Sequence, residues 1–433
     1  MSRFPVSCAA FALLAGAALA QQPAPAVSPM SLSAAQSTAL QQVSAFQQAQ
    51  IDEAIATEDV RQAEAALLPR ARSASTIAYN SPAHLPVVTS GDQSFIAQNA
   101  IHEYQELLGV TGEVNFGLVA GVRRARALLR VARLGTEIAR RTFIRGVNET
   151  YFGAALATAK RRAAEQSLAA AEEFERVTEL NYRAGEVPEI DVIRARLQSA
   201  ARRDDLVQAR QAEAVANATL STLLGTGITT TPDIEPLPQS INPTDIASIT
   251  TEGVARRPEL AQLEAQVQAA RADIGVARAD RLPRITYSVD EGFDAPSLTP
   301  EVLRQHRGVL AVANIDIPIF DWGALRSRQR QAELRAQGAE LQRQITTRDL
   351  YLQFASARQE AVTAAERVTN AEHGVADGER NLAISISRYR AGEGPITEVT
   401  DAQTTLATMR QTLQQALFDY QIARARLLES VGR

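Results

Sequence analysis

The pentapeptide Tyr182-Arg183-Ala184-Gly185-Glu186 occurs a second time as Tyr389-Arg390-Ala391-Gly392-Glu393. The register then continues without a gap: Pro188 aligns with Pro395, Val192 with Val399, and Gly225 with Gly432. An internal repeat of this kind constrains the architecture before any single residue is interpreted. Each copy is typical of a long helix, a tight glycine turn and a second long helix. The sequence therefore predicts two similar halves, each built on an αα-hairpin that is too long to fold back on a compact core.

The repeat also sets the expected domain boundaries. We predict a signal peptide at 1–20, an N-terminal linker at 21–31, a first repeat at 32–225, an irregular equatorial connection at 226–256 and a second repeat at 257–433. Each repeat is expected to contain a helix, two strands, a long helix, a tip turn and a last helix.

The first 20 residues have the features of a secretory signal: a basic residue, a short apolar run and the cleavage motif Ala18-Leu19-Ala20. Cys8 is the only cysteine and lies inside this segment, so the mature chain is expected to have no disulfide, no Cys metal site and no lipid-anchored cysteine. No later stretch of about 18–20 apolar residues suggests a transmembrane helix. Any membrane crossing is therefore expected to use β-strands.

Composition and motifs exclude several function classes. With 45 basic and 49 acidic residues the net charge is -4, which gives no general reason to bind nucleic acid. The four histidines are scattered, and no His/Asp/Glu pair has metal-ligand spacing on one helix face. Gly225-Thr226-Gly227 lacks the lysine of a phosphate-binding loop. We therefore expect no enzyme activity, no cofactor and no metal.

Hydrophobic periodicity predicts the elements within each repeat. In the first repeat we expect a helix at 33–68, strands at 73–79 and 110–118, and helices at 121–182 and 189–224. In the second repeat we expect a helix at 258–281, strands at 285–293 and 309–317, a helix of about 65 residues ending at Tyr389, and a helix at 396–431.

The long helices carry a coiled-coil pattern. In the second half, small or apolar residues step by three and four without a break from 354 to 389 and from 406 to 427, which indicates supercoiled packing. The first half keeps the period less cleanly. Its expected stripe has two polar breaks, Gln166 and Glu173. The full stripe is Leu156, Ala159, Ala163, Gln166, Ala170, Glu173, Val177 and Leu180.

Four amphipathic strands in a chain cannot close a barrel, and open sheet edges are not tolerated in lipid. Several copies must therefore share one barrel, and three copies give twelve strands with room for a lumen. All four strands join the helices at the same end of the rods. The sequence thus predicts a barrel in one membrane, continued by a helical tube whose tips lie far from it.

The chain resembles the TolC-like outer-membrane efflux proteins over essentially all of the mature sequence. The residues that carry the resemblance are the two Tyr-Arg-Ala-Gly-Glu segments, Leu68-Pro69, Leu282-Pro283, Arg257-Pro258-Glu259-Leu260, Ile317-Pro318-Ile319-Phe320-Asp321-Trp322-Gly323 and Asp401-Ala402-Gln403. The resemblance implies a mainly α fold with a small β part: a homotrimer with a twelve-stranded outer-membrane β-barrel and a periplasmic α-helical coiled-coil tunnel. It also implies docking to a periplasmic adaptor and an inner-membrane transporter.

The resemblance further suggests gate residues near the tips. Family members close the periplasmic end with acids on the inner helices, and the matching positions are Glu398 and Asp401, with Asp191 in the first half. In a trimer these carboxylates would form acidic rings that attract cations and restrict the opening. Alternatively, Asp191 and Glu398 are ordinary acids at helix N-termini, where the helix dipole favours them.

The tip turns themselves have two interpretations. Gly185 and Gly392 are expected to adopt left-handed conformations that end the long helices. By resemblance, these turns together with Arg183 and Arg390 would contact the adaptor.

The family holds its gate shut with a basic residue in the second tip turn. This chain has Gly394 at that position and so lacks the charge. Arg183 and Arg390 could replace that charge, or could be solvated arginines at helix ends.

Two function classes remain open from the residues alone. The first is a passive outer-membrane exit duct for an efflux or type I secretion system. The second is an exported coiled-coil scaffold or envelope spacer without a pore. The amphipathic strands favour the duct, because a spacer needs none. The tunnel faces carry no recognisable ligand pocket, so the cargo is not predicted.

Overall fold

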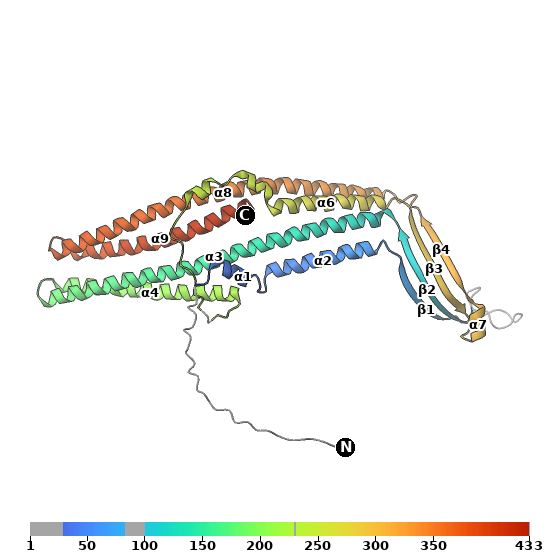
Figure 1. Ribbon diagram of the computed structural model, residues 1–433, viewed down its shortest axis with the longest axis horizontal. Coiled ribbons are helices and arrows are strands. Elements are labelled where there is room, and N and C mark those ends of the chain that lie inside the picture. Colours follow the sequence, from blue (N-terminus) through green and yellow to red (C-terminus); the bar gives the residue numbers. More distant parts are fainter. Residues whose placement is uncertain (1–28, 83–99, 229–230, 433) are drawn as a thin grey trace, which may run out of the picture.

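The computed structural model describes residues 29–82, 100–228 and 231–432. The expected signal peptide and nearly all of the expected linker lie outside these residues. The described chain consists of long helical rods with a small antiparallel sheet at one end (Figure 1). The two helical tips lie side by side at the opposite end of the rods.

The order of elements follows the repeat. The first half comprises α1 (Leu32–Ala39), α2 (Ala45–Ala65), β1 (Arg70–Tyr79), β2 (His102–Val114), α3 (Phe116–Arg183) and α4 (Glu189–Leu224). The equatorial connection holds α5 (Pro243–Ala247) and the 3-10 helix η1 (Thr251–Arg256). The second half comprises α6 (Pro258–Ala279), β3 (Arg284–Ala295), α7 (Pro300–Gln305), β4 (Arg307–Asp316), α8 (Ala324–Arg390) and α9 (Ile396–Ser430). At 68 residues α3 is about 100 Å long.

The helix expected at 33–68 is two helices, so this prediction was wrong in detail. The chain leaves the helical conformation between α1 and α2, over residues 40–44. The break lets α1 bury Ala35 and Ala39 in the main core, while α2 continues along α3. Packing of these two alanines therefore overrides the continuous helical pattern.

The strand expected at 110–118 was also misplaced. β2 ends at Val114, and the alternation at 115–118 belongs to the start of α3. Asn115 adopts extended geometry and its side-chain oxygen accepts hydrogen bonds from the backbone N–H groups of Gly117 and Leu118. This N-cap starts the helix five residues earlier than the expected position of Gly121.

The sheet has the strand order β1-β2-β3-β4, and every neighbouring pair is antiparallel. β1 and β4 are its edges, and within the described residues neither has a partner on its outer side. All four strands meet the helices at the same end, as the sequence predicts. The sheet therefore presents two open edges.

The two faces of the sheet differ in polarity and exposure. One face, called here the apolar face, carries Leu108, Val110 and Val289, which are 66%, 42% and 49% exposed. The opposite face, called here the polar face, carries Asp290, which is only 2% exposed. A sheet that packs on a protein core and faces water on its other side buries its apolar face. Here these apolar side chains are exposed while Asp290 on the opposite face is sheltered, which is the pattern expected of a lipid-facing sheet.

The helical rods pack as two hairpins, α3/α4 and α8/α9, with α3 contacting α9 between them. In α8 the predicted stripe is confirmed, because Phe354, Ala361 and Val368 are all nearly inaccessible. In α3 the predicted stripe was wrong by one residue. The buried positions in its lower part are Ala157, Ala164, Ala171, Phe174 and Thr178. With so many alanines, adjacent stripes differ little in hydrophobicity, and the sequence pattern alone could not choose between them.

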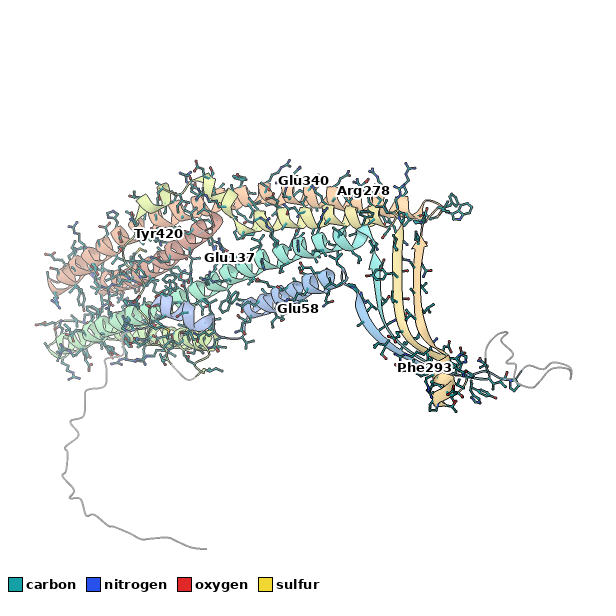
Figure 2. All side chains as sticks on the ribbon, turned by 45° about the vertical axis from the view of Figure 1, so that its right-hand side comes forward. Glu58, Glu137, Arg278, Phe293, Glu340 and Tyr420 are labelled. Carbon is teal, nitrogen blue, oxygen red and sulfur yellow. The ribbon has the colours of Figure 1, made fainter. Side chains whose placement is uncertain are left out.

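The equatorial connection crosses both hairpins and is held by two buried tyrosines. Tyr151 of α3 donates its hydroxyl hydrogen to the Met30 carbonyl at 2.8 Å and accepts from the backbone N–H of Glu235 at 3.1 Å. Tyr420 of α9, which lies in the helical body (Figure 2), accepts from the N–H of Asn242 at 3.1 Å. Each tyrosine satisfies backbone groups that the connection would otherwise leave without partners.

None of the helices in the described part of the chain is both long and apolar enough to cross a membrane.

Candidate functional site

The two tip turns have matching backbone geometry. Gly185 has φ 79° and Gly392 has φ 72°, so both lie in the left-handed region that glycine reaches without strain. Pro188 and Pro395 then cap α4 and α9 with the same angles, φ -76° and ψ 157°. The predicted mechanical role of the glycines is confirmed. Because the turns are so alike, any difference between the tips must come from side chains.

Asp191, the acid of the first tip, lies between the hairpins. It is 9% exposed, and its Oδ2 accepts a hydrogen bond from the Tyr389 hydroxyl at 3.1 Å. The Tyr389 ring also packs against Phe174 with a centroid separation of 5.7 Å. Tyr389 belongs to α8 and Asp191 to α4, so this contact fastens the second hairpin to the first near their ends.

The environment of Tyr389 favours its protonated form. Burial and the neighbouring Asp191 carboxylate together raise the pKa of Tyr389 to about 12, with burial the larger cause. A neutral phenol can donate to the carboxylate, whereas a phenolate would repel it. The link between the hairpins therefore depends on a proton that stays on Tyr389 at neutral pH.

Glu398, the acid at the equivalent position of the second tip, has a different partner. Arg388 Nη1 lies 2.8 Å from Glu398 Oε2, and the same guanidinium reaches the Glu393 carbonyl at 3.4 Å. A Cβ on Gly394 would lie only 3.0 Å from Glu398 Oε2. The absence of a side chain at 394 thus leaves room for the ion pair across the turn.

Asp401 lies one helical turn further along α9. Its side chain is exposed and makes no hydrogen bond or ion pair with another residue among those the structure describes. Nearby, Gln198 of α4 donates to Thr404 of α9 at 3.0 Å, which is a second polar link between the hairpins. Of the three predicted acids, Asp401 is therefore the one whose charge is left without a partner in the described chain.

The two arginines expected as substitute gate residues do not contact these acids. Arg183 pairs with Glu179 of its own helix at 2.6 Å, and both side chains are well exposed. Arg390 makes no ion pair within the described residues. Sequence reasoning missed two residues at the second tip. Arg388 directly precedes the repeated pentapeptide, and Tyr389 is its first residue. The available signal was that Asn181 stands in the first copy where Arg388 stands in the second.

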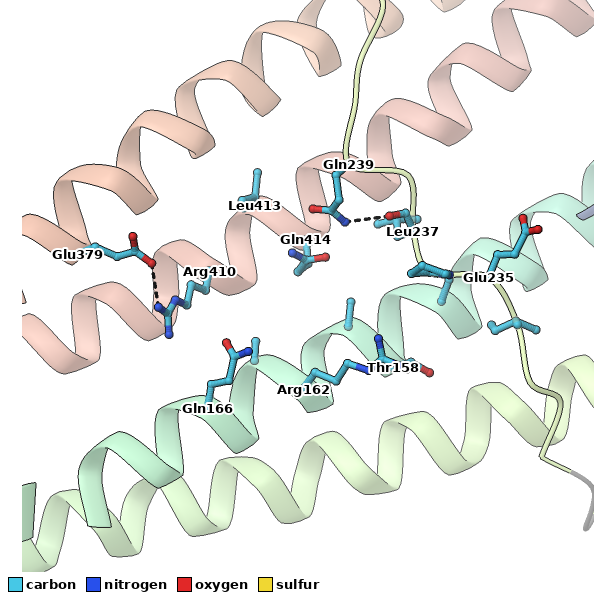
Figure 3. Close-up of a pocket in the computed structure, with 15 residues that line it drawn as sticks. Thr158, Arg162, Gln166, Glu235, Leu237, Gln239, Glu379, Arg410, Leu413 and Gln414 are labelled. Atoms are coloured by element: carbon cyan, nitrogen blue, oxygen red, sulfur yellow. Dashed lines mark hydrogen bonds and ion pairs between the residues drawn. The ribbon is translucent and has the colours of Figure 1, made fainter. Parts of the chain in front are cut away.

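A cavity of about 370 Å³ lies further up the rods, between α3, α9 and the equatorial connection (Figure 3). Its wall includes Arg410, which pairs with Glu379 at 2.8 Å, and the side chain of Arg162. The side-chain amide oxygen Oε1 of Gln414 is buried there without a hydrogen-bond donor from the described chain. The described residues contain no cluster of three His, Cys, Asp or Glu side chains suited to a metal ion.

The sheet contributes a charged pair on its polar face. Arg72 of β1 lies 3.4 Å from Asp290 of β3, and the pair spans the intervening strand β2. Gly109 of β2 makes this possible, because a Cβ there would collide with the Asp290 carboxylate. Asp290 is sheltered while the Arg72 side chain stays half exposed, which is the arrangement expected of a polar face that lines an interior.

Comparison with known proteins agrees with this geometry. The family model of outer membrane efflux proteins matches residues 35–226 and 252–433. The chain belongs to this family. The two matched segments coincide with the two repeats, and the gap between them coincides with the equatorial connection.

Individual relatives support the assignment. The pyoverdine export outer membrane protein OpmQ of Pseudomonas aeruginosa is 27% identical over 357 residues, which cover 79% of this chain and 71% of OpmQ. The cation efflux system protein CusC of Escherichia coli is 25% identical over 311 residues, covering 69% of this chain and 66% of CusC. A crystal structure of CusC matches 93% of this chain and 92% of its own chain with a TM-score of 0.80 at 20% identity. The MtrE channel of Neisseria gonorrhoeae matches with a TM-score of 0.76 at 18% identity.

Three expectations drawn from the resemblance are confirmed: the fold, the transport function and the outer-membrane location. The fold is mainly α with a small β part, and it is the fold of solved outer-membrane channels. The protein is an outer-membrane efflux channel with its helical part in the periplasm. The family consists of transport channels rather than enzymes.

Proposed function

We propose that three copies of the chain assemble into the passive exit duct of a tripartite efflux system. The observation that carries this proposal is the sheet, which combines exposed apolar side chains on one face, a sheltered Asp290 on the other and two open edges. In lipid an open edge leaves backbone groups without partners, so β4 of one copy must pair with β1 of another. Three such sheets supply twelve strands and enclose a polar lumen.

The helical rods would continue this lumen as a tunnel through the periplasm. A rod of about 100 Å is several times longer than a bilayer is thick, so it suits contact with an adaptor and an inner-membrane transporter at the tips. The tip residues Arg183, Gly185, Arg390 and Gly392 are all exposed. We infer that they form the docking surface for the adaptor.

The duct itself is inferred to be unselective for cargo and to have no enzymatic role. Proteins similar to this chain are named for different cargoes, namely pyoverdine in OpmQ and cations in CusC. A conduit whose walls are built from helix surfaces can serve unrelated cargoes if the transporter selects them. The pump that partners this chain would therefore determine what passes.

We infer that the tips form the periplasmic gate. Tyr389 and Asp191 fasten the hairpins together, which keeps the tips close. Asp401, with no partner in the described chain, would supply an acidic ring in the trimer, and Glu398 would add to it once released from Arg388. Opening would separate the hairpins at the Tyr389–Asp191 contact.

Planar-bilayer recording tests both parts of this proposal. The purified chain should form detergent-stable trimers that conduct, and the double variant Glu398→Ala, Asp401→Ala should show lower cation preference or higher conductance. A detergent-independent, water-soluble monomer would contradict the duct and favour the spacer. If the double variant formed conducting trimers with unchanged selectivity and conductance, only the assignment of the gate residues would be contradicted.

A further inference from the structure

The end of the sheet that is remote from the helices carries a groove on the apolar face. The groove has a volume of about 390 Å³ and lies between the short helix α7 and strands β2, β3 and β4. Phe293, at this end of β3 beside α7 (Figure 2), forms part of its wall. Because the helices are periplasmic, this end of the sheet faces the outside of the cell.

The apolar part of the groove continues the lipid-facing surface. Leu108 of β2 and Leu303 of α7 line it together with Phe293. In the ladder register Leu108 is opposite Glu291, which is opposite Val309, so these three form a row across the apolar face. The next row outward is Glu106, Phe293 and Arg307. Both rows therefore mix apolar and charged side chains, and the Glu106 and Glu291 carboxylates belong to the wall of the groove together with Arg307.

The outer row falls where the membrane boundary is expected. From Asp316 to Arg307, β4 has ten residues, which is the length of a tilted strand that crosses a bilayer core. Arg307 therefore lies at the outer interface, where lipid head groups begin. An acyl chain lying along Leu108 would bring its head group next to Arg307 in the outer row.

Two arginines at the rim of the groove have unused donors. Arg307 contacts Glu291 through Nη2 at 2.6 Å. Arg304 of α7 reaches Glu301 and the Pro300 carbonyl only at 3.4 Å. A guanidinium carries five N–H donors, and its fork matches the geometry of a phosphate. Both side chains are mostly exposed, so their remaining donors are accessible.

We propose that this groove binds a phosphorylated glycolipid of the outer leaflet, with an acyl chain on Leu108, Phe293 and Leu303 and a phosphate on Arg304 and Arg307. The glycolipid is favoured over a phospholipid because the groove lies at the outward-facing end of the sheet. The proposal depends on the outer-membrane location and not on the gate.

Native mass spectrometry of the full-length protein in mild detergent tests the proposal with diphosphoryl lipid A as the probe. The unmodified chain should retain the lipid. The affinity of the double variant Arg304→Gln, Arg307→Gln should be lower by a factor of at least about ten, because losing one charge-assisted hydrogen bond alone corresponds to roughly that factor. Lipid A without its phosphates should bind the unmodified chain as weakly as diphosphoryl lipid A binds the double variant.

Arg284→Gln is the matched control. Arg284 begins the same strand β3, is exposed and ion-paired with Asp316, but lies at the periplasmic end. Its substitution should leave lipid retention unchanged. An equal loss of lipid A retention in the control and the double variant would overturn the proposal. Retention of phosphatidylglycerol by the unmodified chain as strong as that of diphosphoryl lipid A would also overturn it. A lower proportion of trimers in the double variant would instead assign the groove to contact between copies.

Discussion

The tip of the first hairpin, α3/α4, and the tip of the second, α8/α9, share a five-residue sequence and nearly identical turn geometry, but their acids are held differently. Asp191 is buried and bonded to a tyrosine of the other hairpin. Glu398, at the equivalent position, is more exposed and paired with Arg388 of its own hairpin. One tip acid therefore connects the hairpins, and the other stabilises only its own turn.

The repeated tyrosines show the same asymmetry. Tyr182 of the first tip is 42% exposed, whereas Tyr389 packs against Phe174 and reaches Asp191. Duplication supplied both tips with the same side chain, and the packing of one hairpin on the other gave only one copy a buried partner. The functional difference between the repeats thus arises from tertiary contacts and not from the repeated motif.

Removing the Tyr389 side chain should have the largest effect on this asymmetry. Tyr389→Ala eliminates the ring packed on Phe174 and leaves the buried Asp191 without its donor, so we expect a loss of about 3 kcal/mol in the free energy of unfolding. Tyr389→Phe keeps the ring and should cost about 1–3 kcal/mol. Chemical denaturation of the detergent-solubilised protein measures both values, and planar-bilayer recording should show higher conductance in each variant.

Tyr182→Phe is the control for this prediction, since it makes the same chemical change at the repeated position. It should alter neither stability nor conductance. If Tyr182→Phe and Tyr389→Phe behaved alike, the two tips would be equivalent and the asymmetry would have no functional meaning.

Sequence reasoning could predict the tips but not their partners. The helix ends, the glycine conformations and the positions of the acids follow from local pattern, because capping and turn geometry are set by a few neighbouring residues. The bond between Tyr389 and Asp191 joins residues of different hairpins, and no local rule indicates which of two identical tyrosines contacts the other hairpin. The same limit applies to the sheet, where Asn115 and the pairing of β2 with β3 decided the strand boundary.

Alkaline pH should weaken the link between the hairpins without any mutation. The pKa of Tyr389 is raised to about 12 from an ordinary value of 10. A raised pKa means that the stabilisation is complete below pH 10 and is lost as the pH rises through about 12. The difference in unfolding free energy between the unmodified chain and Tyr389→Phe should therefore shrink across this range. A difference that stays constant from pH 9 to pH 12 would show that the phenol proton does not maintain the contact.

The ion pair at the second tip should give the smallest change in stability and a distinct change in selectivity. Arg388 and Glu398 are both partly exposed, and exposed pairs contribute about 0.2–1 kcal/mol. Arg388→Gln should therefore barely alter unfolding, but it releases the Glu398 carboxylate and should raise cation preference in planar-bilayer recordings. Arg390→Gln removes the same charge two residues away, where Arg390 has no ion pair within the described chain. A larger shift for Arg388→Gln would attribute the effect to the released acid, whereas equal shifts would mean that only net charge at the tip matters.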